Sequence, residues 1–183
     1  MSEISDYDLL EMFKQEDRKH YAFNLLVRKY QKKLYWHIRK LVISHDDTDD
    51  LLQNTFLKVW KNLHRFRSDS QLFTWLYRIA TNEALNHISK EKRKYSAQHI
   101  DDKENHIFNT LESDSYFNGD EIQLKLQKAI LTLPEKQRLV FNMKYFDDMK
   151  YEEMSEILGT STGALKASFH IAVKKIEKFL EED

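Results

Sequence analysis

Residues 151–180 read YEEMSEILGTSTGALKASFHIAVKKIEKFL, and this stretch decides the fold of the second half of the chain. A small residue, Ser155, is followed four positions later by Gly159 and six positions after that by Leu165. In a helix-turn-helix the small residue lets two helices pack closely, the glycine supplies a positive φ, and the apolar residue anchors the second helix. The spacing therefore predicts two helices and a tight turn, with Thr160 or Ser161 capping the second helix.

The predicted second helix has one apolar and one basic face. The apolar stripe consists of Leu165, Phe169, Ala172, Ile176 and Leu180, and the opposite stripe consists of Lys166, His170, Lys174 and Lys178. Such a basic face can meet phosphates and base edges in a major groove. The alternative is an ordinary amphipathic helix with a solvated basic face, and the helix-turn-helix spacing favours the DNA interpretation. Because few cations are present, the domain alone should bind weakly and need a partner.

Helical periodicity extends over most of the chain on both sides of one break. Before the break, apolar residues recur at helical spacing in residues 26–41, 51–63 and 75–87. After it, the pattern predicts helices over 121–131, 135–145, 151–158 and 161–180, with Pro134 at the start of the second of these. The break, residues 97–120, has no sustained helical period and carries one basic and six acidic residues. We interpret it as an acidic linker.

The composition agrees with an all-α fold class. The 183 residues include only three glycines and one proline, which tight hairpins would need in larger number. There is no cysteine, so disulfides and thiolate metal sites are excluded and a reducing compartment is expected. No basic stretch is followed by an apolar core at the start, and no apolar run approaches the ~20 residues of a membrane span. The sequence predicts a cytoplasmic protein without membrane insertion.

Two small helical domains, residues 1–96 and 121–183, are therefore expected on either side of the linker at 97–120. They differ in charge: residues 1–96 carry 18 Lys and Arg against 13 Asp and Glu, whereas the remainder carries 11 against 17. The net charge of −1 conceals this asymmetry and by itself argues against a nonspecific nucleic-acid coat.

In the first domain, residues 56–94 interleave aromatic and basic side chains. Rings that stack on unpaired bases and cations that hold the backbone are what single-stranded DNA binding requires. Trp60, Trp75 and Tyr77 sit at spacings that a helical core also explains. Better candidates for base contact lie in the polar break between two predicted helices: Phe66, Arg67, Ser70 and Gln71.

Just upstream, four carboxylates fall within five residues: Asp46, Asp47, Asp49 and Asp50. They could suggest a magnesium site and hence a nuclease. Acidic residues in the first turn of a helix, however, cap it and complement its dipole. No phosphate loop, no nucleophile-and-base set and no zinc-binding histidine spacing accompanies them. The sequence therefore predicts no catalysis, no metal and no cofactor.

Two stretches of the sequence resemble one known protein family. The stretch DDLLQNTFLKVWKNLHRFRSDSQLFTWLYRIATNEALNHISKEKRK resembles region 2 of bacterial sigma factors, and LPEKQRLVFNMKYFDDMKYEEMSEILGTSTGALKASFHIAVKKIEKFL resembles their region 4. With no region 1 or region 3 between them, the chain is similar to the extracytoplasmic-function (ECF) sigma factors of the sigma-70 superfamily. The resemblance covers nearly everything except the first residues and the linker.

The resemblance implies a promoter-specificity subunit of bacterial RNA polymerase with three binding surfaces. One docks on the clamp coiled coil of the polymerase β′ subunit through Asp49, Asp50, Gln53, Asn54, Phe56 and Val59. One recognises and melts the −10 promoter element through Phe66, Arg67, Ser70, Gln71, Phe73, Arg78, Asn82 and His87. One reads the −35 duplex through Ser161, Thr162, Lys166, Ala167, His170 and Lys174. Region 4 is also expected on the β flap, with the linker near the RNA exit channel.

The resemblance further implies an anti-sigma factor as a partner, because relatives are commonly held inactive by a membrane-bound one. This chain departs from many relatives, which carry arginines in the recognition helix where it has Ala167, Phe169, Ile171 and Val173. Polymerase docking should supply the missing −35 affinity through effective concentration.

Two other functions compete with this interpretation. A freestanding helix-turn-helix regulator would bind closed duplex without polymerase and would leave the aromatic cluster of residues 60–77 unexplained. A metal-dependent nuclease on the four-Asp cluster would lose cleavage when Asp49 and Asp50 become Asn.

Overall fold

The computed structural model describes residues 4–67, 69–97, 103–114 and 120–182, and all regular structure in these ranges is helical. The predicted all-α fold class is confirmed. The elements, in chain order, are α1 (Asp6–Phe13), α2 (Lys19–Val42), α3 (His45–Asn62), the short 3₁₀ helix η1 (Leu63–Arg65), α4 (Leu72–Ala97), α5 (Lys103–Ser113), α6 (Glu121–Thr132), α7 (Glu135–Tyr145), α8 (Tyr151–Leu158) and α9 (Thr162–Glu181).

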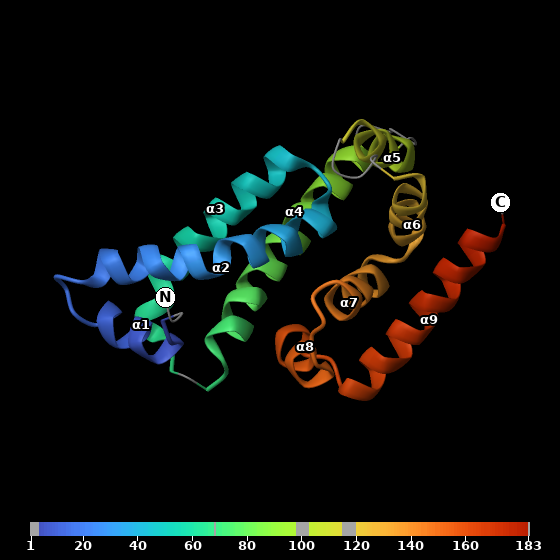
Figure 1. Cartoon of the computed structure of the whole chain (residues 1–183). Coiled ribbons are helices and arrows are strands. Elements are labelled where there is room, and N and C mark those ends of the chain that lie inside the picture. The colour runs from blue at the N-terminus through green and yellow to red at the C-terminus, as the bar shows by residue number, and fades with distance from the viewer. Residues whose placement is uncertain (1–3, 68, 98–102, 115–119, 183) are drawn as a thin grey trace.

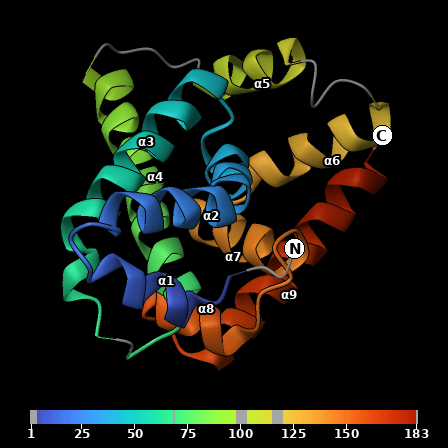
Figure 2. The same cartoon turned by 60° about the vertical axis from the view of Figure 1, so that its left-hand side comes forward.

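The first domain is built on three long helices, α2, α3 and α4, which pack against one another (Figures 1 and 2). Their apolar stripes supply side chains with no exposed surface, among them Leu34 and Ile38 of α2, Val59 of α3 and Leu76 of α4. Helices of this length owe most of their stability to such an amphipathic face rather than to intrinsic propensity.

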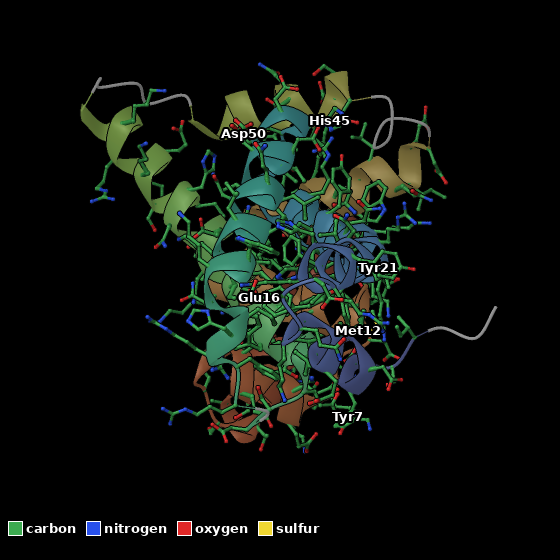
Figure 3. The ribbon with its side chains drawn as sticks, turned by 90° about the vertical axis from the view of Figure 1, so that its left-hand side faces the viewer. Tyr7, Met12, Glu16, Tyr21, His45 and Asp50 are labelled. Atoms are coloured by element: carbon green, nitrogen blue, oxygen red, sulfur yellow. The ribbon has the colours of Figure 1, made fainter. Side chains whose placement is uncertain are left out.

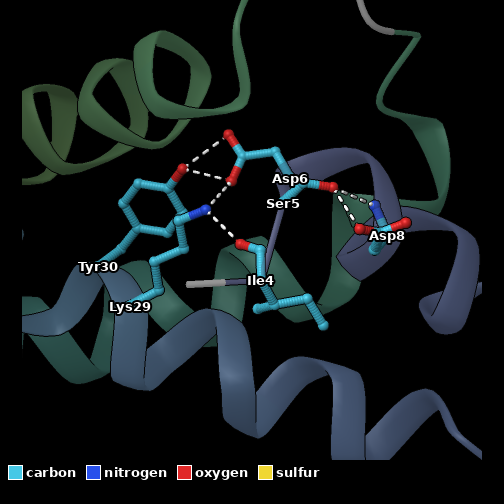
Figure 4. Close-up of polar contacts among 6 residues, drawn as sticks. All are labelled: Ile4, Ser5, Asp6, Asp8, Lys29 and Tyr30. Carbon is cyan, nitrogen blue, oxygen red and sulfur yellow. Dashed lines mark hydrogen bonds and ion pairs between the residues drawn. The ribbon is translucent and has the colours of Figure 1, made fainter. Parts of the chain in front are cut away.

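The short helix α1 is held on α2 by polar contacts (Figure 4). The carboxylate of Asp6 accepts hydrogen bonds from Tyr30 Oη at 2.6 Å and from Lys29 Nζ at 2.8 Å, and Lys29 also donates to the carbonyl of Ile4 at 2.8 Å. The N-cap Ser5 accepts a hydrogen bond from the Asp8 amide. An eight-residue helix is marginal alone, so these contacts and the burial of Leu9 fix it.

The second domain consists of α6, α7, α8 and α9. The helices expected at 121–131, 135–145, 151–158 and 161–180 agree with the observed ones to within one residue at each end. Pro134 is the residue before α7, whose first amide needs no partner within the helix. Phe141 of α7 stacks on Phe169 of α9 at a centroid distance of 5.8 Å. Phe141 belongs to a small apolar core that also contains Ala129, Ile130 and Ile176.

The segment predicted as a linker, residues 97–120, contains a helix, α5, although its sequence has no helical periodicity. Leu111 of α5 is fully buried against Ile43 at the end of α2, with Leu124 and Leu131 of α6 beside it. Asp114, just after the helix, forms an ion pair with Arg39 of α2. Besides the buried leucine and this ion pair, Glu112 of α5 forms an ion pair with Lys128 of α6. These contacts hold the helix, and none of them produces a repeating apolar pattern.

The two domains pack against each other, α4 against α8 and α2 against α7. Leu139, Val140 and Met143 of α7 belong to the same apolar cluster as the core of the first domain. Polar contacts cross the junction as well: Asp147, in the loop after α7, lies 3.1 Å from Nδ1 of His37 and 2.5 Å from Nζ of Lys40. We call this boundary the junction below.

Candidate nucleic-acid interface

Helices α8 and α9 form the predicted helix-turn-helix. Gly159 ends α8 in the left-handed region with φ of 63°, and its amide donates to the carbonyl of Ser155 at 2.9 Å. Ser161 is the N-cap of α9, with its hydroxyl accepting a hydrogen bond from the Ala164 amide at 3.3 Å. Leu165 is 1% exposed, as expected for the anchor of the second helix. The structure therefore agrees with the roles predicted for Gly159, Ser161 and Leu165.

The face of α9 opposite this anchor is open to solvent. Five of the six residues predicted for −35 contact are exposed, namely Ser161, Lys166, Ala167, His170 and Lys174, and Thr162 is half-buried. Lys166 Nζ lies 5.6 Å from the ring centroid of Tyr151 at the start of α8, a cation–π distance. The structure thus presents a contiguous surface of two lysines and a histidine along one side of α9, which we call the recognition face.

The residues predicted for −10 contact divide between two sides of α4. Arg67 and Gln71 are exposed in the segment before α4, and Asn82 is exposed on the helix itself. Asn82 lines an open cavity of about 640 Å³ between α3 and α4. The lining includes five polar residues that were not predicted from the sequence: Lys58, Asn62, Arg65, Glu83 and Asn86. Asn86 could have been found, since it lies one helical turn after Asn82.

Three other members of that set face elsewhere. Arg78 donates from Nη2 to the carbonyl of Glu156 in α8 at 2.7 Å, across the junction. Phe73 is half-buried beside Tyr77 at a centroid distance of 4.3 Å. His87 lies on the side of α4 toward α3, with Nε2 3.6 Å from Asp47 Oδ2. The structure therefore does not bring the predicted −10 residues together on one free surface.

The aromatic residues of this region have mostly structural surroundings. Tyr77 is 2% exposed, and burial raises the pKa of its hydroxyl, with a smaller contribution from the Asp147 carboxylate. Trp60 packs edge-on against Phe13 at 5.5 Å. Half-buried Phe66 lies 5.3 Å from the ring of Trp75. Partial burial leaves one part of Phe66 available at the surface, next to Arg67.

Helix α3 presents a polar surface on the side away from the core. Asp49, Asp50, Gln53 and Asn54 are all exposed, and Figure 3 labels Asp50 near the start of the helix. Leu57, one turn further on, is 52% exposed and interrupts this polar surface with an apolar side chain. Sequence reasoning missed Leu57 because a leucine in an amphipathic helix is normally assigned to the core.

Two residues predicted for polymerase contact are buried instead. Phe56 is 9% exposed and Val59 is not exposed at all, and both lie in the core of the first domain. Their side chains face α2 and α4 because they lie on the apolar stripe of α3. Neither side chain is available at the surface in this structure, and contact of these two residues with polymerase stays a prediction. The exposed candidate surface of α3 consists of Asp49, Asp50, Gln53, Asn54 and Leu57. We call it the α3 face.

No three histidine, aspartate or glutamate side chains gather into a metal-binding group within the residues that the structure describes. In the described helices, none is long and apolar enough to cross a membrane.

Comparison with known proteins places this geometry in a family. A family model described as sigma-70 region 2 matches residues 26–94, which run from α2 to α4, and one described as sigma-70 region 4 matches residues 123–176, from α6 to α9. The chain is an ECF sigma factor of the sigma-70 family. Such a factor directs transcription initiation by RNA polymerase.

Relatives of this sigma factor align over almost their whole length. It is 30% identical to the RNA polymerase sigma-H factor of Pseudomonas aeruginosa, over 99% of this chain and 96% of the relative. It is 31% identical to the ECF RNA polymerase sigma-E factor of Escherichia coli K12, over 97% of this chain and 95% of the relative.

Solved structures share the fold of this sigma factor across both domains. The sigma factor RpoE of Bartonella quintana, in complex with the anti-sigma factor NepR, superposes with a TM-score of 0.69 at 24% identity, covering 88% of this chain and 98% of that one. CnrH, in complex with the cytosolic domain of CnrY, superposes with a TM-score of 0.68 at 22% identity, covering 97% and 98%.

Proposed function

We propose that this sigma factor docks on core RNA polymerase through the α3 face, reads the −35 duplex with the recognition face of α9, and contacts the −10 element from the α3–α4 segment. It contributes no catalysis of its own. The observation that carries the proposal is the helix-turn-helix of α8 and α9, whose cationic side is free while its apolar side is buried. Cations on the exposed side of such a helix suit phosphates, and side chains at its centre suit base edges.

The −10 contact is assigned to the free side of the first domain. Arg67, Gln71 and Asn82 supply polar groups there, and Phe66 supplies a ring that can stack on an unpaired base. Stacking is worth about 1–3 kcal/mol per base, so capture of two bases could offset the opening of only a few base pairs. The surface suits trapping of a short melted segment.

Arg78 enters this surface only when the junction opens. In this structure the two domains pack against each other at the junction, which we call the docked arrangement. There the guanidinium of Arg78 donates a hydrogen bond to a carbonyl of α8. We therefore propose that polymerase binding separates the two domains and releases Arg78 toward the −10 DNA. The β flap is the proposed site for region 4, and the segment that contains α5 spans the two domains.

An anti-sigma factor is a proposed regulatory partner. The relatives RpoE and CnrH were solved with NepR and the cytosolic domain of CnrY, respectively. The match to these chains includes both domains, which supports the docked arrangement as the one that a regulator of this type would bind.

The test is runoff transcription with purified sigma factor, bacterial core polymerase and a pool of promoter fragments from its own genome. Specific transcripts that require both proteins are the expected result. Absence of transcripts, together with a gel shift of closed duplex by the factor alone, would instead identify a freestanding regulator.

A further inference from the structure

Arg138 of α7 is a buried cation that is not fully hydrogen-bonded. It is 8% exposed, and its Nε is buried without a hydrogen-bond partner among the described residues. Burial lowers the pKa of this guanidinium, and the carboxylate of neighbouring Glu135 offsets only part of that effect. A buried charge that is not fully hydrogen-bonded is costly, so its presence calls for an explanation.

Arg138 lines a cavity of about 400 Å³ at the junction. Its lining residues come mainly from the end of α2, the second half of α4 and the α6–α7 connection. Its apolar lining comes from both domains, with Ile43 and Ile88 from the first and Leu131 and Leu133 from the second. Charged side chains line it as well, three of them acidic and two basic: Asp47, Glu91, Glu135, Lys92 and Arg138.

The other charged residues of this wall are already paired. Glu135 forms an ion pair with Lys92. His87 lies 3.6 Å from Asp47, and Glu91 lies 3.8 Å from Lys94. Among the lining charges of the described residues, Arg138 is the one without an ion pair of its own, and it shares the influence of Glu135 with Lys92. An added carboxylate would meet this incompletely paired cation beside the apolar side chains of the lining.

We propose that this cavity binds a small carboxylate with an apolar tail, the carboxylate pairing with Arg138 and the tail lying on Ile43, Ile88 and Leu133. An arginine and a carboxylate can form two parallel charge-assisted hydrogen bonds, which would satisfy the buried guanidinium. The apolar wall would then exclude water from the pair. Because the wall comes from both domains, the ligand stabilises the docked arrangement by mass action.

The first test needs no ligand. Arg138→Met replaces an unpaired buried charge by an apolar side chain of similar length, so the melting temperature Tm of the empty protein should stay equal or rise. Lys136→Met, on the exposed side of the same helix, removes one positive charge as a matched control. A clear fall of Tm in Arg138→Met alone would mean that the guanidinium has a stabilising partner, and would overturn the proposal.

The second test uses octanoate as the probe and 1-octanol as the uncharged control, with the full chain in calorimetric titration. Octanoate should bind the unmodified protein and Lys136→Met with the same Kd, and Arg138→Met about tenfold or more weakly. Equal binding of octanoate and octanol would show an apolar cavity only, and no binding of octanoate would show no site. Either result would contradict the proposal without affecting the proposed sigma function.

Discussion

Lys166, His170 and Lys174 follow one another at four-residue intervals on α9, and each has its side chain in solvent. Their spacing places them above one another on the helix surface, so a single groove of DNA can meet all three. The recognition face has only two lysines and one histidine among its predicted contact residues, so each cation should account for a measurable part of the binding.

Lys166→Ala is expected to weaken −35 binding and to lower the slope of log K against log salt by about one, as for loss of one phosphate contact. Fluorescence anisotropy of holoenzyme on promoters found by runoff transcription measures both. The control is Lys175→Ala, because Lys175 lies on another side of α9 and donates to Gln137 at 3.0 Å. An equal change of slope in the two variants would contradict the assignment of the recognition face.

The carboxylate of Asp147 is largely buried and contacts two side chains of α2, His37 and Lys40. Since a carboxylate only accepts hydrogen bonds, the hydrogen in its contact with His37 is on Nδ1, and Nε2 of the same ring forms a hydrogen bond with the Thr81 hydroxyl at 2.8 Å. Burial alone would raise the pKa of Asp147, but the hydrogen bonds and charges of His37 and Lys40 outweigh burial and hold the pKa below its ordinary value of 3.8.

This lowered pKa makes a pH-dependent prediction. A carboxyl group whose pKa is lower in the folded than in the unfolded state stabilises the fold above the unfolded value, and that stability is lost as the pH falls through the folded value. Asp147→Asn should reduce the unfolding free energy at pH 7 by about 3 kcal/mol. The difference from the unmodified protein should shrink below pH 3.8. Urea unfolding from pH 7 to pH 3 measures it, and a constant difference would refute the role of this ionisation.

At the scale of single helices, α3 combines a buried stripe with an exposed polar surface that contains one apolar residue. Leu57 contributes little to the fold because half of it is in solvent. Burial of an exposed leucine against a partner is worth about 1.5–3 kcal/mol, and an apolar residue surrounded by polar ones is a common arrangement in protein interfaces.

Leu57→Ala is therefore expected to weaken binding to core polymerase about tenfold while leaving the thermal stability of the free factor nearly unchanged. Competition for core polymerase with a labelled sigma factor measures the affinity. Tyr21→Ala is the matched control, since Tyr21 is a 62% exposed apolar residue of α2. Equal effects of the two substitutions would remove Leu57 from the α3 face.

Helices with a long apolar stripe could be predicted from the sequence, and α8 and α9 show why. Ser155, Gly159 and Leu165 each have a local requirement, namely space, positive φ and burial, which residue type and spacing specify. The helix α5 could not be predicted in this way. Its burial depends on Leu111 reaching Ile43, far away in sequence, and no periodic pattern records such a single contact.

The candidate sites were predictable as segments but not as individual side chains. Phe56 and Asn54 are neighbours in sequence, yet one lies in the core and the other in solvent. The side chain of Arg78 points toward α8 because it donates to the carbonyl of Glu156, which lies 78 positions later in the sequence. Contacts of that kind arise from domain packing and leave no local signal.

At the scale of the whole molecule, the junction has an apolar core, but several of its buried polar atoms lack a hydrogen-bond partner. Buried polar atoms without a hydrogen-bond partner, in the part of the chain that the structure describes, include Nε of Arg78, Nε of Arg138 and Oδ1 of Asn142. These three residues face the other domain, and buried polar groups of this kind cost free energy. The junction is therefore suited to opening, and its opening is what the proposed release of Arg78 requires.

The ion pair between Lys40 and Asp147 crosses the junction, so reversing one of its charges tests whether it holds the two domains together. Asp147→Lys places two cations together in a buried site, so the domains should separate while each keeps its helices. Small-angle X-ray scattering should then give a larger radius of gyration, and circular dichroism should change little. The matched control is Asp148→Lys, because the Asp148 side chain is 96% exposed.

Restoring the pair in reverse completes the test. Lys40→Glu combined with Asp147→Lys puts opposite charges back at the same two positions, and the double variant should return to the radius of gyration of the unmodified protein. Such recovery isolates the interaction between the two residues, since each single change alone disrupts it. If the single variant Asp147→Lys stays compact, or if the double variant stays as expanded as the single one, then this ion pair does not hold the two domains together.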